Sequence, residues 1–279
     1  MYMKQASTFV QGLNVSANGI RQHVLRYGGN GDGRGERDAI VLVPGITSPA
    51  ITWGFVGERL GQHFDTYVLD VRGRGLSSAS ASLDYSLDAQ IEDILALVKA
   101  LGLTRYALIG HSMGARIIAG AAAQQPEGLA RMVLIDPPVS GPGRRAYPAN
   151  WAWYGDSIAA ASQGCDREAM RKFCPTWTDE QVDLRAEWLH TCDIRAIKTS
   201  FDGFHSDDFH RFLPLLQVPT LLMTAERGDV VLPADVQEIE SLVKGEFLHH
   251  RVPAAGHMIP WDNEEGFYAG FGAFLGVRV

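Results

Sequence analysis

The sequence predicts an α/β fold with a mainly parallel central sheet. Short, continuous apolar runs such as AIVLVPG (39–45), YALIG (106–110) and RMVLID (131–136) are typical of strands that are buried on both faces. Segments with the spacing of helices separate several of these runs. Because strands that alternate with helices pair in parallel through crossover connections, this order favours one sheet with helices on its faces.

The predicted elements begin with a hairpin. Residues 12–29 contain two strands that meet at Asn18-Gly19, a dipeptide that favours the positive φ angles of a two-residue turn. The segment 86–103 carries apolar residues at helical spacing and ends at Leu-Gly-Leu. The remaining predictions are strands at 39–45, 65–75, 106–110, 131–136, 219–225 and 246–253, and helices at 113–126, 233–244 and 263–276.

The interval 139–213 interrupts this alternation. It is rich in tryptophan and charge and contains helical patches such as DREAMRKFC and DEQVDLRAEWLH, but no buried-strand run. We therefore expect a helical cap (lid) at 139–213, inserted over the carboxyl edge of the sheet, and a core domain formed by 1–138 and 214–279.

The bulk composition limits the partners. The chain has 279 residues, of which 46% are hydrophobic and 20% charged, as expected for a globular domain with a sizeable core. Its formal net charge of −7 disfavours nucleic acid but allows a small anionic substrate, because a local Arg or Lys outweighs net charge inside a pocket. Cys165, Cys174 and Cys192 match no zinc-ligand spacing, so we expect reduced thiols and no metal.

The sequence shows no pattern typical of a secretory signal or a membrane span. The N-terminal segment MYMKQASTFVQG lacks the apolar stretch of a secretory signal, and no apolar run approaches the roughly 18 residues that a membrane span needs. We therefore expect a cytoplasmic protein without a membrane partner, and the sequence does not distinguish a monomer from a homo-oligomer.

Ser112 lies in the motif Gly-x-Ser-x-Gly, within LIGHSMGAR (108–116). A strand is predicted before it and a small-residue helix after it, which is the context of a nucleophile elbow: a tight strand-to-helix turn that exposes the serine hydroxyl. Gly110 and Gly114 leave room for the neighbouring backbone. Since a serine hydroxyl is a weak nucleophile without an adjacent base, the motif predicts a histidine nearby.

His257 is the predicted base, because it follows the last predicted strand in a loop. His111 adjoins the serine, and we expect it to line the pocket instead. The acid is open between two positions. Asp136 ends the strand that follows the nucleophile helix, and Asp229 follows the next strand. Either carboxylate is placed to orient a histidine after the last strand and to stabilise its imidazolium form.

The oxyanion of an acyl-transfer reaction needs two preorganised N–H donors. One is expected to be the amide of Met113, the residue after the nucleophile. The other is expected in the loop after the strand that ends in VLVPG, at Ile46. Thr47 or Ser48 could add a hydroxyl from the same loop.

Taken together, these segments resemble the α/β-hydrolase superfamily over nearly the whole chain. VPGITSPAITW, DVRGRGLS, GHSMG, LIDPP and AAGHMIPWDN occur in the family's order. The first segment departs from the family's His-Gly opening, because Pro44 replaces the histidine. The resemblance implies the α/β-hydrolase fold with a helical cap, a cofactor-free Ser–His–acid hydrolase, and a structural role for Arg72 in the motif from Asp70 to Ser77.

The resemblance also bears on the acid. Many members carry it after the later strand in a Gly-x-x-Asp pattern, but here Gly228 occupies that position and Asp229 is one residue out of register. Other members carry it after the earlier strand, 24 residues beyond the nucleophile, and Asp136 matches this spacing. The resemblance therefore favours Asp136, with Asp229 as the alternative acid.

Within the superfamily, GITSPA, GHSMGAR and the Ser–Asp–His spacing are most similar to the N-formylmaleamate deformylases of nicotinate degradation and to hydrolases of acylaminomethylene-succinates. This similarity implies cleavage of an acyl–nitrogen (amide) bond in a small unsaturated carboxylate, with N-formylmaleamate giving maleamate and formate. The alternatives are an esterase, a lactonase or a carbon–carbon bond hydrolase on the same triad and, outside enzymes, a ligand receptor on a hydrolase scaffold.

An anionic substrate of this kind requires a cation in the pocket, and an Arg that binds a carboxylate through two hydrogen bonds is best suited. Arg116, one helical turn after Ser112, is a candidate, as are Arg195 and Lys198 in the insertion. Each is also explained as an ordinary packing or surface charge. The tryptophans of the insertion are expected to pack in the lid.

Overall fold

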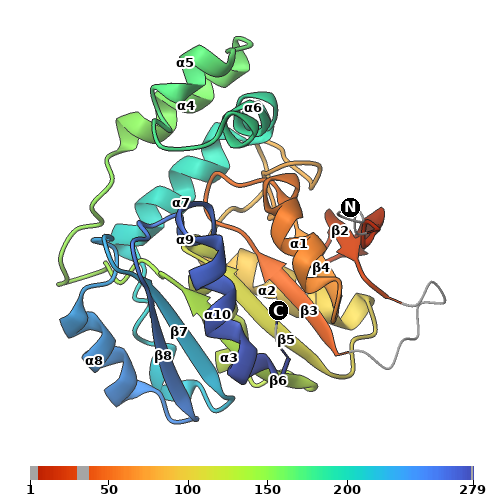
Figure 1. Cartoon of the computed structure of the whole chain (residues 1–279), viewed down its shortest axis with the longest axis vertical. Coiled ribbons are helices and arrows are strands. Elements are labelled where there is room, and N and C mark those ends of the chain that lie inside the picture. The colour runs from red at the N-terminus through yellow and green to blue at the C-terminus, as the bar shows by residue number, and fades with distance from the viewer. Residues whose placement is uncertain (1–5, 30–37, 278) are drawn as a thin grey trace, which may run out of the picture.

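A twisted sheet forms the centre of the computed structural model, which describes residues 6–29, 38–277 and 279 (Figure 1). The predicted core domain includes residues 1–5 and 30–37, which lie outside the described part. The strands are β1 (Phe9–Ala17), β2 (Ile20–Tyr27), β3 (Ala39–Val43), β4 (Asp65–Leu69), β5 (Tyr106–His111), β6 (Leu129–Ile135), β7 (Thr220–Ala225) and β8 (Phe247–Val252).

The order of these strands is β1-β2-β4-β3-β5-β6-β7-β8. β2 pairs antiparallel with β1 and with β4, and every pair from β4–β3 to β7–β8 is parallel. The parallel strands therefore direct their carboxyl ends toward one edge of the sheet, where side chains from distant parts of the chain can meet.

The predicted hairpin is confirmed. β1 and β2 pair across Asn18-Gly19, and the φ angles of these residues are 51° and 71°. Positive φ at both central residues matches the turn that this dipeptide favours. The strand predicted at 65–75 ends earlier, at Leu69, because the chain then turns through Gly73 and Gly75, which both have positive φ.

Helices cover both faces of the sheet (Figure 1). On one face, a hydrophobic cluster joins the sheet to α2 (Leu87–Ala100), α3 (Met113–Ala123) and α8 (Pro233–Leu242). On the other face, a second cluster joins it to α1 (Gly54–Leu60) and α10 (Glu264–Leu275). Alternate residues of β3 enter the two clusters, so this strand is buried on both sides, as its continuous apolar run predicts.

Two short helices were not predicted, α1 and α9 (Ile259–Asp262), nor was the 3₁₀ turn η1 (Ala50–Trp53). The sequence does not predict α1, because it contains Gly54 and Gly57 and glycine is a poor helix former. The structure explains why position 57 is a glycine. A Cβ there would lie 2.5 Å from the Tyr27 ring, so a larger residue would push the helix away from β2.

Between β6 and β7 the chain forms helices and no strand, and every residue of this interval is described. α7 (Ile194–Ser206) contributes Ile197, Phe201 and Phe204 to the cluster that contains α3 and β5. In Figure 1, α4 (Trp151–Ser162), α5 (Arg167–Arg171) and α6 (Asp179–Trp188) stand beyond α7, at the top of the view. The interval also contains the 3₁₀ turns η2 (Leu189–Thr191) and η3 (Leu213–Leu215), and η3 packs against α3 and α8.

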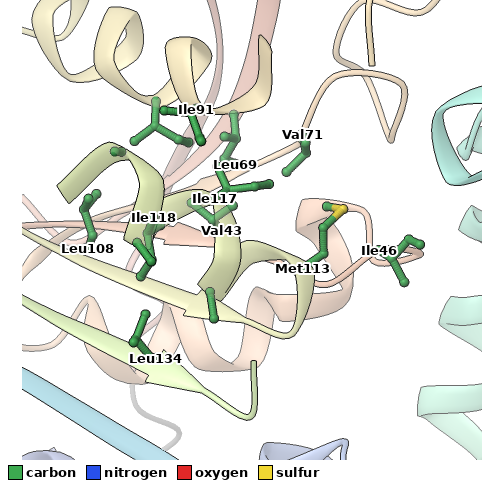
Figure 2. Packing of buried hydrophobic residues seen from close by; sticks show 14 of the residues in the cluster. Val43, Ile46, Leu69, Val71, Ile91, Leu108, Met113, Ile117, Ile118 and Leu134 are labelled. Carbon is green, nitrogen blue, oxygen red and sulfur yellow. The ribbon is translucent and has the colours of Figure 1, made fainter. Parts of the chain in front are cut away.

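The N-terminus of α3 packs directly against the end of β3. Figure 2 shows Ile117 and Ile118 of α3 among Val43, Leu108 and Leu134 of the sheet. A Cβ on Gly114, in the first turn of this helix, would lie 2.0 Å from the Val43 carbonyl oxygen. Only glycine allows the helix to approach so closely.

Gly114→Ala is expected to lower the free energy of unfolding by about 3 kcal/mol or more, because overpacking against backbone has no flexible side chain to absorb it. Urea unfolding measures the change. Gly272→Ala in α10 is the matched control, since its nearest neighbour would be 3.6 Å away, and it should change stability by less than about 1 kcal/mol. Equal effects of the two changes would refute the close approach.

Candidate active site

Ser112 occupies a strained turn between β5 and α3. Its backbone angles, φ 54° and ψ −117°, are unfavourable for a residue with a side chain. A Cβ on Gly110 would lie 2.5 Å from the Gly114 carbonyl, so this side of the turn also requires glycine. The Ser112 amide donates to the Ile135 carbonyl at 2.8 Å, which fixes the turn to the end of β6.

The His257 imidazole lies between Ser112 and Asp136. Its Nε2 is 3.0 Å from Ser112 Oγ, and its Nδ1 is 2.7 Å from Asp136 Oδ2. A carboxylate only accepts hydrogen bonds, so Nδ1–H donates to Asp136 and the Nε2 lone pair accepts from the serine hydroxyl. This tautomer is the one that a general base for Ser112 requires.

Asp136 is placed by the ends of two neighbouring strands. It follows β6, its side chain is fully buried, and its amide donates to the Met223 carbonyl of β7 at 2.8 Å. Its φ of 45° turns the chain sharply at this point. The carboxylate therefore reaches His257 from the floor of the site.

Asp229, the other acid left open by the sequence, lies in a different environment. It is exposed at the margin of the cavity beside Ser112, and its backbone carbonyl accepts from Arg145 Nη1 at 2.8 Å. In the described chain no hydrogen bond joins its carboxylate to His257. The geometry thus brings Asp136, and not Asp229, to the imidazole.

The two amides expected to hold an oxyanion belong to segments that border Ser112. A Cβ on Gly45 would lie 3.5 Å from the Ser112 Cβ, and Ile46 lines the same cavity as the serine. Met113 is the first residue of α3, so its N–H has no carbonyl partner within the helix. Figure 2 shows Ile46 and Met113 at the same end of the hydrophobic cluster.

His111 lines the cavity, as expected, and also supports the His257 loop. Its Nε2 is 2.9 Å from the His257 carbonyl oxygen. Burial, together with the neighbouring His257, lowers the pKa of His111 to about 3. His111 is therefore neutral near pH 7, and its Nε2–H donates to the carbonyl without adding a positive charge beside the imidazole of His257.

A cavity of about 430 Å³ adjoins Ser112. Loop 45–48 contributes Thr47 and Ser48 to its lining, and both residues are buried. Most of the opposite wall comes from the 139–213 segment, and it is largely aromatic, which suits a small, flat ligand. The side chains of that wall include Tyr147, Trp153, Tyr154, Phe173, Trp177 and Arg185.

Arg185, on α6, is a buried cation in this wall. The residue is 5% exposed, and its guanidinium carbon lies 5.0 Å from the Trp153 ring centre and 5.7 Å from that of Trp177. Its hydrogen bonds to Thr47 are long, 3.4 and 3.5 Å, and its Nε has no partner in the described structure. A guanidinium with weakly engaged donors and no paired carboxylate among the described residues is suited to bind an anion.

The sequence analysis did not identify Arg185, although a signal was present. Val182, Arg185 and Leu189 recur at the helical spacing of a buried face, and all three are buried. An arginine in an apolar register indicates either a satisfied core cation or a ligand site. The density of charge in this segment conceals the buried register.

The cations that the sequence suggested lie elsewhere. Arg116 is buried, but it does not line the cavity beside Ser112. Its side chain extends toward α7, because it lies on the face of α3 that packs there. Its Nη1 and Nη2 donate to the backbone carbonyls of Pro138, Ser140, Gly203 and Asp207.

Arg195 and Lys198 also lie outside this cavity. Both are about half exposed on α7, where Arg195 pairs with Asp193 and Lys198 pairs with Asp202 at 2.6 Å. Helical geometry directs these side chains away from Ser112. None of the three predicted cations, Arg116, Arg195 and Lys198, lines the cavity beside Ser112.

Tyr147 places a phenol beside the serine, and the sequence offered no spacing signal for it. Its hydroxyl is 3.2 Å from that of Tyr154. Burial raises the pKa of Tyr147 well above its ordinary value, while a hydrogen bond with Ser112 acts in the opposite direction. The phenol therefore stays protonated and can donate a hydrogen bond at the site.

The remaining site classes can be described briefly. Among the described residues, no group of three or more His, Cys, Asp or Glu side chains could hold a metal ion. The helices of the described chain include none with the length and apolar character of a membrane span. Cys165, Cys174 and Cys192 are all free thiols.

Comparisons with known proteins relate the whole chain to hydrolases. The chain is 61% identical over 269 residues to N-formylmaleamate deformylase of Pseudomonas putida KT2440, which covers 96% of this chain and 98% of that protein. The crystal structure of N-formylmaleamic acid deformylase from Pseudomonas putida S16, a serine-to-alanine variant, superposes with a TM-score of 0.88 at 52% identity, covering 94% of this chain and 100% of the other.

More distantly related proteins share the same fold. E-2-(acetamidomethylene)succinate hydrolase superposes with a TM-score of 0.75 at 21% identity, covering 96% of this chain and 100% of the other, which shows a shared fold alone. The sequence profile of the alpha/beta hydrolase fold family matches residues 38–264. With most of its length matched in this way, the chain belongs to the α/β-hydrolase family.

Proposed function

We propose that the protein is a serine hydrolase that cleaves the formyl–nitrogen bond of N-formylmaleamate and releases formate and maleamate. The observation that carries the chemistry is the hydrogen-bonded chain Ser112–His257–Asp136 beside a cavity of about 430 Å³. The 61% identity to a deformylase of that name supports the substrate. The buried cation Arg185 in the same cavity suits the carboxylate of such a substrate.

In the proposed first half-reaction, Ser112 Oγ attacks the formyl carbon while His257 Nε2 takes the hydroxyl proton. The carbonyl oxygen becomes an oxyanion, which accepts hydrogen bonds from the amides of Ile46 and Met113. Asp136 stabilises the imidazolium form of His257. When the carbon–nitrogen bond breaks, His257 gives the proton to the leaving nitrogen, maleamate departs, and a formyl ester remains on Ser112.

In the second half-reaction, water attacks this formyl ester. His257 Nε2 takes a proton from the water, and the same two amides hold the second oxyanion. Collapse of this intermediate returns the proton to Ser112 Oγ and releases formate. Every proton transfer therefore passes through one nitrogen atom, which is 3.0 Å from the serine oxygen in the resting site.

Substrate recognition is proposed to depend on charge and shape. The maleamate carboxylate would accept hydrogen bonds from Arg185, whose guanidinium the rings of Trp153 and Trp177 hold in place. The aromatic wall limits water around this pair, which strengthens the interaction. We also propose that residues 139–213 form the cap that provides this wall. The cytoplasmic location of the protein remains a prediction from the sequence.

The function is tested with Ser112→Ala. Wild-type protein should release formate and maleamate in equal amounts from N-formylmaleamate, and the variant should lose about 10⁴-fold or more in kcat, because no nucleophile remains. Thermal unfolding should stay near the wild-type value as a control. Near-normal turnover by the variant would contradict the mechanism. If the wild-type protein hydrolyses p-nitrophenyl esters or enol-lactones faster than N-formylmaleamate, its substrate belongs to one of those classes instead.

The acid is tested by comparing Asp136→Asn with Asp229→Asn. An asparagine at 136 would favour the wrong imidazole tautomer, so kcat should fall by roughly 10⁴-fold. Asp229→Asn should stay within a few-fold of wild type, since its exposed carboxylate has no hydrogen bond to His257. If only the Asp229 variant loses activity, Asp136 is not the acid.

The anion site is tested with Arg185→Gln. For N-formylmaleamate, kcat/KM should fall by about 10- to 100-fold, the value of one or two charge-assisted hydrogen bonds. The neutral methyl ester of the same substrate should show little change, because it has no charge to bind. Arg195→Gln, on the exposed face of α7, is the matched control. Equal losses on the acid and its ester would show that Arg185 does not bind the carboxylate.

A further inference from the structure

Arg74 is a buried cation that the proposed mechanism does not use. It lies in the loop after β4 and is 1% exposed, yet in the described chain its guanidinium pairs with no carboxylate. Burial lowers its pKa to about 10, so it still carries a positive charge near pH 7. Burying a charge without a counter-ion destabilises the folded state, so a role that offsets this cost is expected for Arg74.

The hydrogen bonds of Arg74 converge on both segments that supply the proposed oxyanion donors. Its Nε donates to the Ile46 carbonyl at 3.1 Å, and its Nη2 lies 3.4 Å from Met113 Sδ. Its Nη1 donates to the Arg72 carbonyl at 2.8 Å, which anchors the guanidinium to its own loop. One rigid, planar group therefore spans the two residues whose amides must point at the same oxygen atom.

The same guanidinium also reaches the cap. Its Nη2 is 2.8 Å from Ser200 Oγ and 3.3 Å from the Ala196 carbonyl, both on α7. A second cavity, of about 240 Å³, separates part of α7 from α3 and is lined by Met113 and Ser200. Met113 has fewer packing neighbours on this side, so the contact with Arg74 is one of the restraints on its side chain.

We propose that Arg74 is a positioning residue, whose guanidinium holds Ile46 and Met113 in register as an oxyanion site and connects that site to the cap helix α7. The inference rests on the proposed function only in assuming that Ser112 forms an oxyanion intermediate. The buried positive charge of Arg74, in contact with both residues, also favours negative charge at this point.

Arg116 provides a matched comparison. It too is 1% exposed, burial lowers its pKa to about 10, and it donates to backbone carbonyls of α7 at Gly203 and Asp207. It donates to neither Ile46 nor Met113. If Arg74 serves only to anchor the cap or to complete the fold, substitutions at Arg74 and Arg116 should have the same consequences.

The experiment compares Arg74→Lys with Arg116→Lys in two measurements. One is kcat and KM for hydrolysis, and the other is affinity for a trifluoromethyl ketone, which adds to Ser112 and forms an oxyanion without turnover. Arg74→Lys should lower kcat and ketone affinity together by about 10- to 100-fold, while KM stays within about threefold of wild type. This loss is smaller than the 10²- to 10³-fold fall in kcat that follows removal of an oxyanion hydrogen-bond donor itself. Arg116→Lys should leave both near wild type.

Met113→Leu keeps the test decisive if the Arg74 variant does not fold. Leucine preserves volume and the backbone amide but removes the sulfur acceptor, so it should lower kcat and ketone affinity several-fold. Ser200→Ala removes only the cap-side acceptor and should have a smaller effect. In a double-mutant cycle, Arg74→Lys and Met113→Leu should be non-additive, because each breaks the same contact.

Three outcomes would overturn the inference: equal losses in the Arg74 and Arg116 variants, a change confined to KM, or unchanged ketone affinity in both Arg74→Lys and Met113→Leu. Because the ketone adduct is measured by binding, its outcome is separate from that of the proposed function. A protein that forms the adduct but does not release formate would refute the deformylase proposal and leave the Arg74 comparison intact.

Discussion

The backbone contact between Gly114 and the Val43 carbonyl is the constraint on which the rest of the site depends. It lets the first turn of α3 sit against the end of β3, so the loop after β3 becomes a neighbour of Ser112 and Met113. A side chain at 114 would force the helix and the strand apart, which would misalign the amides expected to bind the oxyanion. The strained φ of Ser112 is stable because this contact and the pairing with β6 hold both sides of the turn.

Parallel strands bring the other groups to the same place. Asp136 follows β6 and His257 follows β8, so both enter the carboxyl edge of the sheet at which the serine turn ends. His111 then holds the His257 loop through a hydrogen bond that costs no charge, because the buried imidazole is neutral. A fold built in this way positions reactive side chains from rigid strand ends and leaves the cap to determine the shape of the cavity.

The buried arginines differ in how their donors are satisfied, and this difference separates structural cations from a ligand site. Arg72 forms an ion pair with Asp93, and Arg116 is engaged by backbone carbonyls. Arg74 is likewise engaged, but by the segments around the proposed oxyanion site. Arg185 alone of these four lines the cavity beside Ser112, with long contacts and an unpartnered Nε.

The sequence by itself determined the elements whose signals are local. Continuous apolar runs predicted the buried strands, Asn18-Gly19 predicted the hairpin, and the glycines around Ser112 predicted the elbow, because each of these depends on nearby backbone and side-chain geometry. The tertiary structure shows which carboxylate reaches His257: Asp136, buried directly after β6, lies 2.7 Å from the imidazole, whereas Asp229 is exposed beyond the end of β7. It also places Arg185, and not Arg116, in the lining of the cavity beside Ser112. The spacing of Val182, Arg185 and Leu189 indicates burial, but which cavity a long side chain enters depends on the elements that pack around it.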